Sequence, residues 1–118
     1  MRFLCLYKPA KPEGTPPSEK DMADMGKLIT EMKQAGVLLA TEGCLPSAAG
    51  ARVRQTGVSY TVKDGPFTES KELVAGMALL QVKSKAECIE WTKQFLKVAG
   101  DGECEVRQIF DGSDCVPG

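Results

Sequence analysis

A continuous apolar run from Leu73 to Val82 (LVAGMALLQV) constrains the fold of this chain more than any other feature. Successive side chains of a β-strand point to opposite faces, so a strand of this composition is apolar on both faces. Residues 3–7 (FLCLY) and 37–40 (VLLA) have the same character. Strands with one wet face normally alternate apolar and polar residues. The run therefore predicts a sheet that is covered on both faces.

The other segments predict the order strand, helix, strand, hairpin, strand, helix, strand. Strands are expected at residues 2–8, 37–45, 73–82 and 103–110, helices at 19–35 and 85–99, and the hairpin at 51–56 and 58–63. Ser18 and Ser84 are the expected N-caps, and Gly36 and Gly100 end the helices. Each helix is expected to bury one apolar stripe: Met22, Met25, Ile29 and Met32 in the first, and Cys88, Trp91, Phe95 and Val98 in the second. Apart from the extra β-hairpin, this is the βαββαβ order of a ferredoxin-like α+β fold with an antiparallel sheet.

Two helices can cover only one face of a four-stranded sheet, so the second apolar face needs another cover. If water covered it, the exposed patch would exceed the few hundred Å² that is typical of monomers. A second copy of the same sheet is the simplest cover, and it gives a symmetric dimer with a barrel-like interior. The alternative is that some strands are assigned wrongly and the chain is an ordinary monomer.

Composition narrows the classes of function. The 118 residues predict a single domain, 1–118, and the net charge of −1 argues against nucleic acid as a direct partner. No apolar run reaches the ~18 residues of a membrane span, and the N-terminal stretch is too short for a secretory signal, so we expect a cytoplasmic protein. The five cysteines are odd in number and form no CxxC pair, which indicates reduced thiols. Those in apolar segments are expected to be small core hydrophobes: Cys5, Cys44, Cys88 and Cys104.

The chain contains no histidine. This excludes Ser-His-Asp and Cys-His catalysis and every His-ligated metal site. Acid–base chemistry would have to come from carboxylates, lysine, tyrosine or a thiolate. Neither a P-loop nor a GxGxxG pattern occurs, and we expect no cofactor and no metal.

Residues 64–67 read Asp-Gly-Pro-Phe and lead into the charged stretch Thr-Glu-Ser-Lys-Glu at 68–72. This segment resembles the DGPF signature of the YCII-related domain family. Residues 36–40, 42–46, 51–54 and 103–107 and the helix with Trp91 are also similar to that family, so the resemblance spans nearly the whole chain.

The resemblance implies a bacterial protein whose ferredoxin-like fold forms a dimeric α/β barrel. The YciI branch of the family is thought to use a His–Asp pair, which cannot be carried over to a chain without histidine. Some members are encoded near, or fused to, extracytoplasmic-function sigma factors, which implies a sigma-factor-related protein as a partner.

Glu42 is the most unusual charged residue. It is predicted to lie mid-strand on a face that it shares with Leu38, Ala40 and Cys44, which are apolar. A carboxylate in such a place must be paired with a cation or have a raised pKa. The candidate cations are Arg52, Arg54 and Lys71. Such a pair could be structural, or it could bind a polar ligand.

Further candidates lie near the predicted mouth of the cavity. The candidate ligand-binding residues are Tyr7, Arg52, Arg54, Glu69 and Lys71, and the candidate general bases are Glu42 and Asp64. The alternatives are structural. Tyr7 could be a packed aromatic residue whose hydroxyl contacts solvent, and residues 68–72 could be an ordinary solvated loop. Residues 64–67 could form a rigid corner, because Asp-Gly favours a turn and proline fixes φ.

These features favour a small-molecule-binding homodimer with a polar cavity and a regulatory role. One alternative is a small cofactor-independent enzyme that uses carboxylates together with arginine or lysine. Another is an interaction module that binds a protein such as a sigma factor. We expect no direct contact with nucleic acid or with a membrane.

Overall fold

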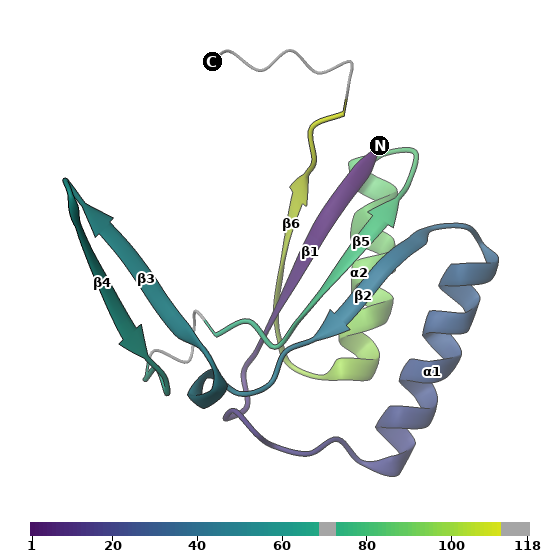
Figure 1. Ribbon diagram of the computed structural model, residues 1–118. Helices are drawn as coiled ribbons and strands as arrows, with labels where there is room; N and C mark the ends of the chain where they lie inside the picture. Colours follow the sequence, from purple (N-terminus) through teal and green to yellow (C-terminus); the bar gives the residue numbers. More distant parts are fainter. Residues whose placement is uncertain (69–72, 112–118) are drawn as a thin grey trace.

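The computed structural model describes residues 1–68 and 73–111 and contains a four-stranded antiparallel sheet, two helices and a separate hairpin (Figure 1). The elements are β1 (Arg2–Pro9), α1 (Glu19–Gln34), β2 (Leu38–Gly43), the 3-10 turn η1 (Ser47–Ala49), β3 (Ala51–Thr56), β4 (Ser59–Asp64), β5 (Gly76–Gln81), α2 (Lys85–Ala99) and β6 (Gly102–Gln108). The strand order β2-β5-β1-β6 is that of the ferredoxin-like fold, so the predicted α+β architecture is confirmed.

Both helices begin at the serines that the sequence predicts. Ser18 Oγ accepts a hydrogen bond from the Asp21 N–H at 3.0 Å, and Ser84 Oγ accepts one from the Glu87 N–H at 3.1 Å. These bonds satisfy backbone donors that the first helical turn leaves without a partner. After α1 the chain reverses at Gly36, whose φ of +73° favours glycine.

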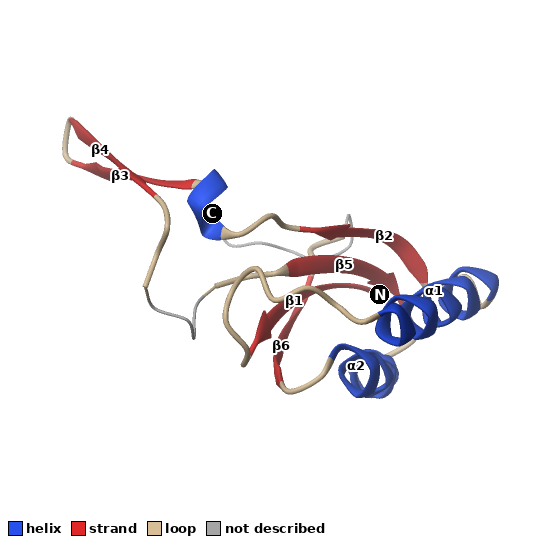
Figure 2. Cartoon of the chain, turned by 90° about the horizontal axis from the view of Figure 1, so that it is seen from below, coloured by secondary structure: helices blue, strands red, loops and turns tan. Residues whose placement is uncertain are grey.

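The two helices cover one face of the sheet (Figure 2). The buried core between them is Phe3, Cys5, Leu28, Met32, Val37, Leu80, Val82 and Cys88. The predicted apolar stripe of α1 is wrong in one respect: Met22 is 55% exposed, and Leu28 is buried instead. Within residues 1–68 and 73–111, neither helix combines the length and apolar character that crossing a bilayer requires.

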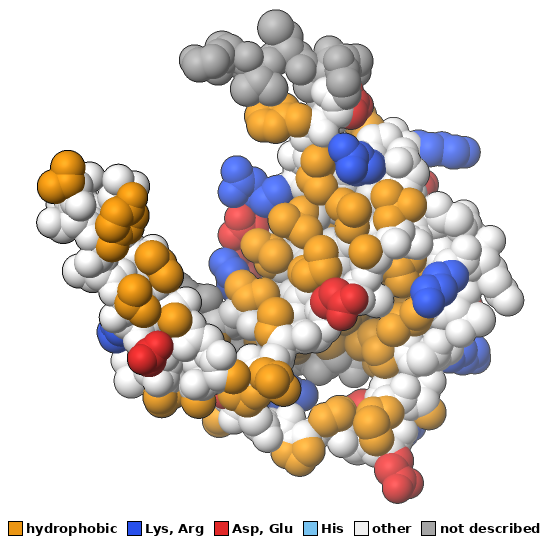
Figure 3. Space-filling model, viewed as in Figure 1, with side chains coloured by type: hydrophobic (Ala, Val, Ile, Leu, Met, Phe, Trp, Pro, Cys, Tyr) orange, Lys and Arg blue, Asp and Glu red, His pale blue; other side chains and the backbone are white. Residues whose placement is uncertain are grey.

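The other face of the sheet carries neither helix (Figure 2). The β1–β5 register places Leu4 beside Leu79 and Leu6 beside Met77 on this face, and all four side chains are half-buried. We call the surface formed by Leu4, Leu6, Ala40, Met77 and Leu79 the open face. Figure 3 shows hydrophobic side chains gathered over the sheet. Central strands that are apolar on both sides are therefore present, as the sequence predicts.

A β-bulge in β2 changes which residues share a face. Leu38 pairs with Leu80, but Ala40 pairs with Leu79, so the register shifts between them. Leu38 consequently faces the helices, whereas Ala40 and Glu42 lie on the open face. The prediction that Leu38 shares a face with Glu42 is wrong, because a bulge interrupts the alternation of side chains.

The hairpin β3–β4 stands apart from the four-stranded sheet (Figures 1 and 2). Its register places Val53 opposite Val62 and Arg52 opposite Lys63, so the ribbon has one apolar and one cationic face. Val53, Tyr60 and Val62 are 65–70% exposed. The paired arms agree with the predicted hairpin, except that β4 extends to Asp64.

The corner at residues 64–67 packs on turn η1. The Gly65 N–H donates to the Gly50 carbonyl oxygen at 3.0 Å, and the Phe67 N–H donates to Ser47 Oγ at 2.9 Å. A Cβ atom on Gly65 would overlap the carbonyl oxygen of Ser47. Residue 65 must therefore be glycine for close approach of two backbone segments, which favours the structural interpretation of this corner.

Replacing Gly65 with alanine should destabilise the protein by about 1–3 kcal/mol, because the new methyl group forces two backbone segments apart. Chemical denaturation monitored by circular dichroism measures the change. Gly26→Ala is the matched control: it lies within α1 with open space at its Cβ, and should stabilise the protein by about 0.5–1 kcal/mol. Equal stability of Gly65→Ala and wild type would contradict the packing described.

Candidate functional site

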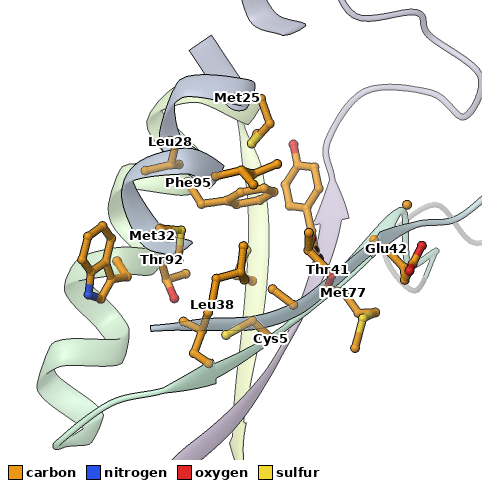
Figure 4. Close-up of a pocket in the computed structure, with 18 of the residues that line it drawn as sticks. Cys5, Met25, Leu28, Met32, Leu38, Thr41, Glu42, Met77, Thr92 and Phe95 are labelled. Carbon is orange, nitrogen blue, oxygen red and sulfur yellow. Dashed lines mark hydrogen bonds between the residues drawn. The ribbon is translucent and has the colours of Figure 1, made fainter. Parts of the chain in front are cut away.

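A cavity of about 360 Å³ lies between the two helices and the helix-facing side of the sheet (Figure 4). Its wall includes Met25, Leu28 and Met32 of α1, Phe95 of α2, Cys5 of β1 and Ala78 of β5. We call this space the inner cavity. Its lining is mainly thioether, thiol, aliphatic and aromatic, which differs from the polar cavity that the sequence predicts.

A second cavity of about 770 Å³ adjoins the first, and we call it the vestibule. The two share lining residues, among them Tyr7, Met25 and Phe95. The proline-rich segment 11–17, which follows β1, lines the vestibule. Together the two spaces form a pocket with an apolar interior and a more polar outer part.

Tyr7 lies where the two spaces meet. Its ring packs edge-on against Phe95, with ring centroids 5.1 Å apart. Its hydroxyl can donate to the carbonyl oxygens of Ala99, Gly100 or Asp101, all at 3.4–3.5 Å, which are long hydrogen bonds. Burial, with smaller contributions from Cys104 and Asp101, raises the pKa of Tyr7. The group at this junction is therefore a neutral phenol.

Three thiols lie around the floor of the inner cavity. Cys5 Sγ and Cys88 Sγ are 3.8 Å apart, and Cys104 is half-buried nearby. Burial raises the pKa of Cys5 to about 12 and that of Cys104 to about 11. These thiols stay protonated at neutral pH, which is unfavourable for nucleophilic chemistry. The expectation that Cys44 is also buried is wrong: it follows the end of β2 and is exposed.

Glu13, which lines the vestibule, is hydrogen-bonded to turn η1. Its two carboxylate oxygens accept hydrogen bonds from the N–H and the Oγ–H of Ser47, both at 2.6 Å. Ser47 Oγ in turn accepts from the Phe67 N–H. The proline-rich segment and the corner at 64–67 are thus joined through one serine.

The structure places the predicted site residues in separate regions. Tyr7 and Glu42 both line the inner cavity, but the Glu42 side chain is exposed and points away from the helices together with that of Met77 (Figure 4). No residue within 1–68 or 73–111 forms an ion pair or hydrogen bond with the Glu42 carboxylate in this chain. The expected pairing with Arg52 or Arg54 is therefore not formed.

The remaining candidates lie on or beyond the hairpin. The Arg52 guanidinium stacks over the Phe67 ring at 4.0 Å from its centroid. Arg54 lies in β3 and Asp64 at the exposed end of β4, and neither lines the inner cavity or the vestibule. Glu69 and Lys71 lie outside the described residues, so their predicted role at a cavity mouth stays a prediction.

The sequence does not predict the inner cavity, although several residues that line this cavity belong to the predicted apolar stripes of the helices. Met25, Met32 and Phe95 fit the helical period of a core, and periodicity does not distinguish a filled core from a hollow one. The only weak signal is the methionine-rich stripe of α1, since methionine is common at adaptable binding surfaces.

Comparisons with known proteins identify the family of the chain and proteins that resemble it. The model of the family described as the YCII-related domain matches residues 1–113. "Uncharacterized protein R00369" from Rhizobium meliloti (strain 1021) is 28% identical over 92 residues, which are 77% of this chain and 74% of that protein. Whether the chain falls in the DGPF branch stays a prediction.

A solved structure has a similar fold. It is 5-chloro-2-hydroxyhydroquinone dehydrochlorinase (TftG) from Burkholderia phenoliruptrix AC1100, in complex with 2,5-dihydroxybenzoquinone. The TM-score is 0.52 at 13% identity, and the alignment covers 95% of this chain and 96% of that chain. At this identity the likeness shows a shared fold alone.

Thiol labelling should distinguish the buried cysteines from Cys44. In mildly alkaline buffer the folded protein should react fast with Ellman's reagent at Cys44, and at Cys5 only after unfolding, because burial disfavours the thiolate. Cys44→Ser should remove one equivalent of fast reaction, and Cys5→Ser should remove none. Fast loss of a Cys5 thiol in the folded protein would contradict the described burial.

The same burial predicts a pH dependence. The pKa of Cys5 rises from 9.0 to about 12 on folding, so above pH 9 the unfolded chain loses a proton that the folded chain keeps. The free energy of unfolding should therefore fall as pH rises from 9 toward 12. Denaturant titrations at several pH values measure this slope, which should be shallower in Cys5→Ser.

Proposed function

Because this chain belongs to the YCII-related domain family, whose model matches residues 1–113, we propose that it is a homodimeric protein that binds a small molecule. The binding site in this proposal is the inner cavity with its vestibule. The observation that carries it is an apolar space of about 360 Å³ in the interior, within the range of known ligand pockets.

The lining favours an uncharged ligand with an apolar body. Aromatic and thioether side chains such as Phe95 and Met32 make favourable contacts with rings. The thiols of Cys5 and Cys104 are neutral at pH 7, and the polar side chains of the vestibule, including Lys11 and Asp21, could meet a polar end of the ligand. Since the structure of the fold neighbour is a complex with 2,5-dihydroxybenzoquinone, small quinones are sensible members of a first thermal-shift screen.

The geometry supports binding better than catalysis. Neither candidate carboxylate is directed into the pocket: Glu42 lines the inner cavity, but its side chain points away from the helices, and Asp64 lies at the end of the hairpin. Burial raises the pKa of the Cys5 and Cys104 thiols, which line the inner cavity, and this disfavours either of them as a nucleophile. Enzymatic activity, a regulatory role and a sigma-factor-related partner stay predictions.

The open face supports the homodimer. Leu4, Leu6, Met77 and Leu79 form a contiguous apolar surface that neither helix covers. A second copy would bury it sheet to sheet, as in aligned sheet packing. As a location we propose the cytoplasm, which is consistent with the free thiols of the four described cysteines.

The binding proposal predicts energy transfer from Trp91 to a neutral fluorescent probe. Trp91 is the single tryptophan of the chain and lines the inner cavity. N-phenyl-1-naphthylamine should bind with quenching of Trp91 emission. Ala78→Leu adds three carbons within the cavity, so it should weaken probe binding about tenfold or more.

Ala23→Leu, at an exposed position of α1, is the matched control and should bind the probe like wild type. Circular dichroism verifies that each variant is folded, and Cys104→Ile replaces Ala78→Leu if the latter unfolds. Unchanged probe affinity in a folded cavity-filling variant would reject the inner cavity as the site.

A further inference from the structure

Glu42 lies on an apolar face, and none of the residues described at 1–68 and 73–111 forms an ion pair with it. It pairs in register with Met77, which pairs with Leu6, which pairs with Glu105. These four residues form one row straight across the open face, from the β2 edge to the β6 edge. No side chain within residues 1–68 or 73–111 neutralises the Glu42 carboxylate, although apolar residues lie beside it.

The opposite end of the same row carries excess positive charge. Glu105 accepts from Arg107 Nη1 at 3.1 Å and from Lys8 Nζ at 3.2 Å. The trio of Lys8, Glu105 and Arg107 thus has one positive charge more than it has negative charges. The next acidic residue on this face, Glu103, lies one row farther along β6, opposite Lys8.

Symmetry relates these two ends in a sheet-to-sheet dimer. Facing sheets keep their strand directions within about 30° of each other, so the two-fold axis runs either nearly along or nearly across the strands. A two-fold axis along the strands exchanges the two edges of the sheet. The β2 edge of one copy then faces the β6 edge of the other. Each cross-strand row therefore lies opposite the same row of the partner, read in the reverse order.

We propose that the two copies pack with the two-fold axis along the strands, and that Glu42 pairs with Arg107 of the partner subunit. This inference rests on the homodimer proposed above and adds the orientation and the residues that fix it. Met77 then faces the partner's Leu6, and Leu79 faces the partner's Leu4. Glu42 then lies opposite the partner's Glu105, with the partner's Arg107 and the partner's Lys8 in the rows on either side, so that two carboxylates meet two cations.

The alternative axis gives a poorer match of charge. With the axis across the strands, β2 faces β2 and β6 faces β6. Two Glu42 carboxylates then approach without a cation, and the two cation-rich trios approach each other. Because like charges across an interface cost several kcal/mol, the first orientation is favoured.

Charge reversal tests the pairing. Wild-type protein should sediment at twice the 12.7 kDa chain mass. Glu42→Arg and Arg107→Glu should each weaken the dimer about tenfold or more, because like charges then meet twice per dimer. An equimolar mixture of the two variants should restore wild-type affinity, since both contacts in the mixed dimer join opposite charges.

Glu31→Arg and Lys97→Glu, on exposed positions of the helices, are matched controls that should leave the dimer unchanged. The double variant Glu42→Arg/Arg107→Glu should dimerise like wild type. If the wild type is dimeric but the two single variants do not restore dimerisation when mixed, the Glu42–Arg107 pairing is rejected and the homodimer is retained. A monomeric wild type at micromolar concentration would reject both.

Discussion

The structure depends on one constraint: its central strands are apolar on both faces, and its two helices can cover only one of them. Side-chain alternation divides β1 between the two environments, with Cys5 on the helix side and Leu6 on the open face. The same division in β5 separates Ala78 from Met77 and Leu79. One sheet therefore supplies the wall of a pocket on one side and leaves an apolar surface on the other, where we propose that a second copy packs.

The two sides of the sheet differ in what covers them, and we propose that they differ in what they bind. On the covered side, helix side chains such as Met32 and Phe95 leave space within the packing, and burial raises the pKa of the Cys5 thiol. The proposed ligand of such a pocket is uncharged. On the open face, the apolar centre lies between the Glu42 carboxylate and the trio of Lys8, Glu105 and Arg107, and this asymmetry is the basis of the proposed dimer orientation.

Local signals in the sequence predicted most of the fold. Ser18, Ser84 and Gly36 define helix ends through short-range hydrogen bonds and backbone conformation, so they could be read without a structure. The alternation in residues 51–63 likewise gave the hairpin. The bulge that turns Leu38 toward the helices is set by pairing with β5, a distant segment, and sequence periodicity carries no sign of it.

The candidate site was harder to predict for the same reason. Tyr7 lines the pocket between the helices and the sheet, and its predicted role in ligand binding stays a prediction. The role of Gly65 depends on the Ser47 backbone, which is distant in the sequence. Glu42 was correctly placed on an apolar face, yet its expected cations on β3 lie on a separate hairpin. If the partner of Glu42 belongs to a second copy, as proposed above, spacing along one chain gives no indication of the pair.

The most direct test of the central claim is the solvent exposure of the open face. Methyl-labelled leucines can be measured by NMR with a water-soluble nitroxide, with Leu80 (2% exposed) and Leu45 (79% exposed) as internal standards. Leu4, Leu6 and Leu79 should be protected like Leu80, because a second sheet covers them. Broadening of these signals to the extent seen for Leu45 would show that water covers the second face, and would contradict the account.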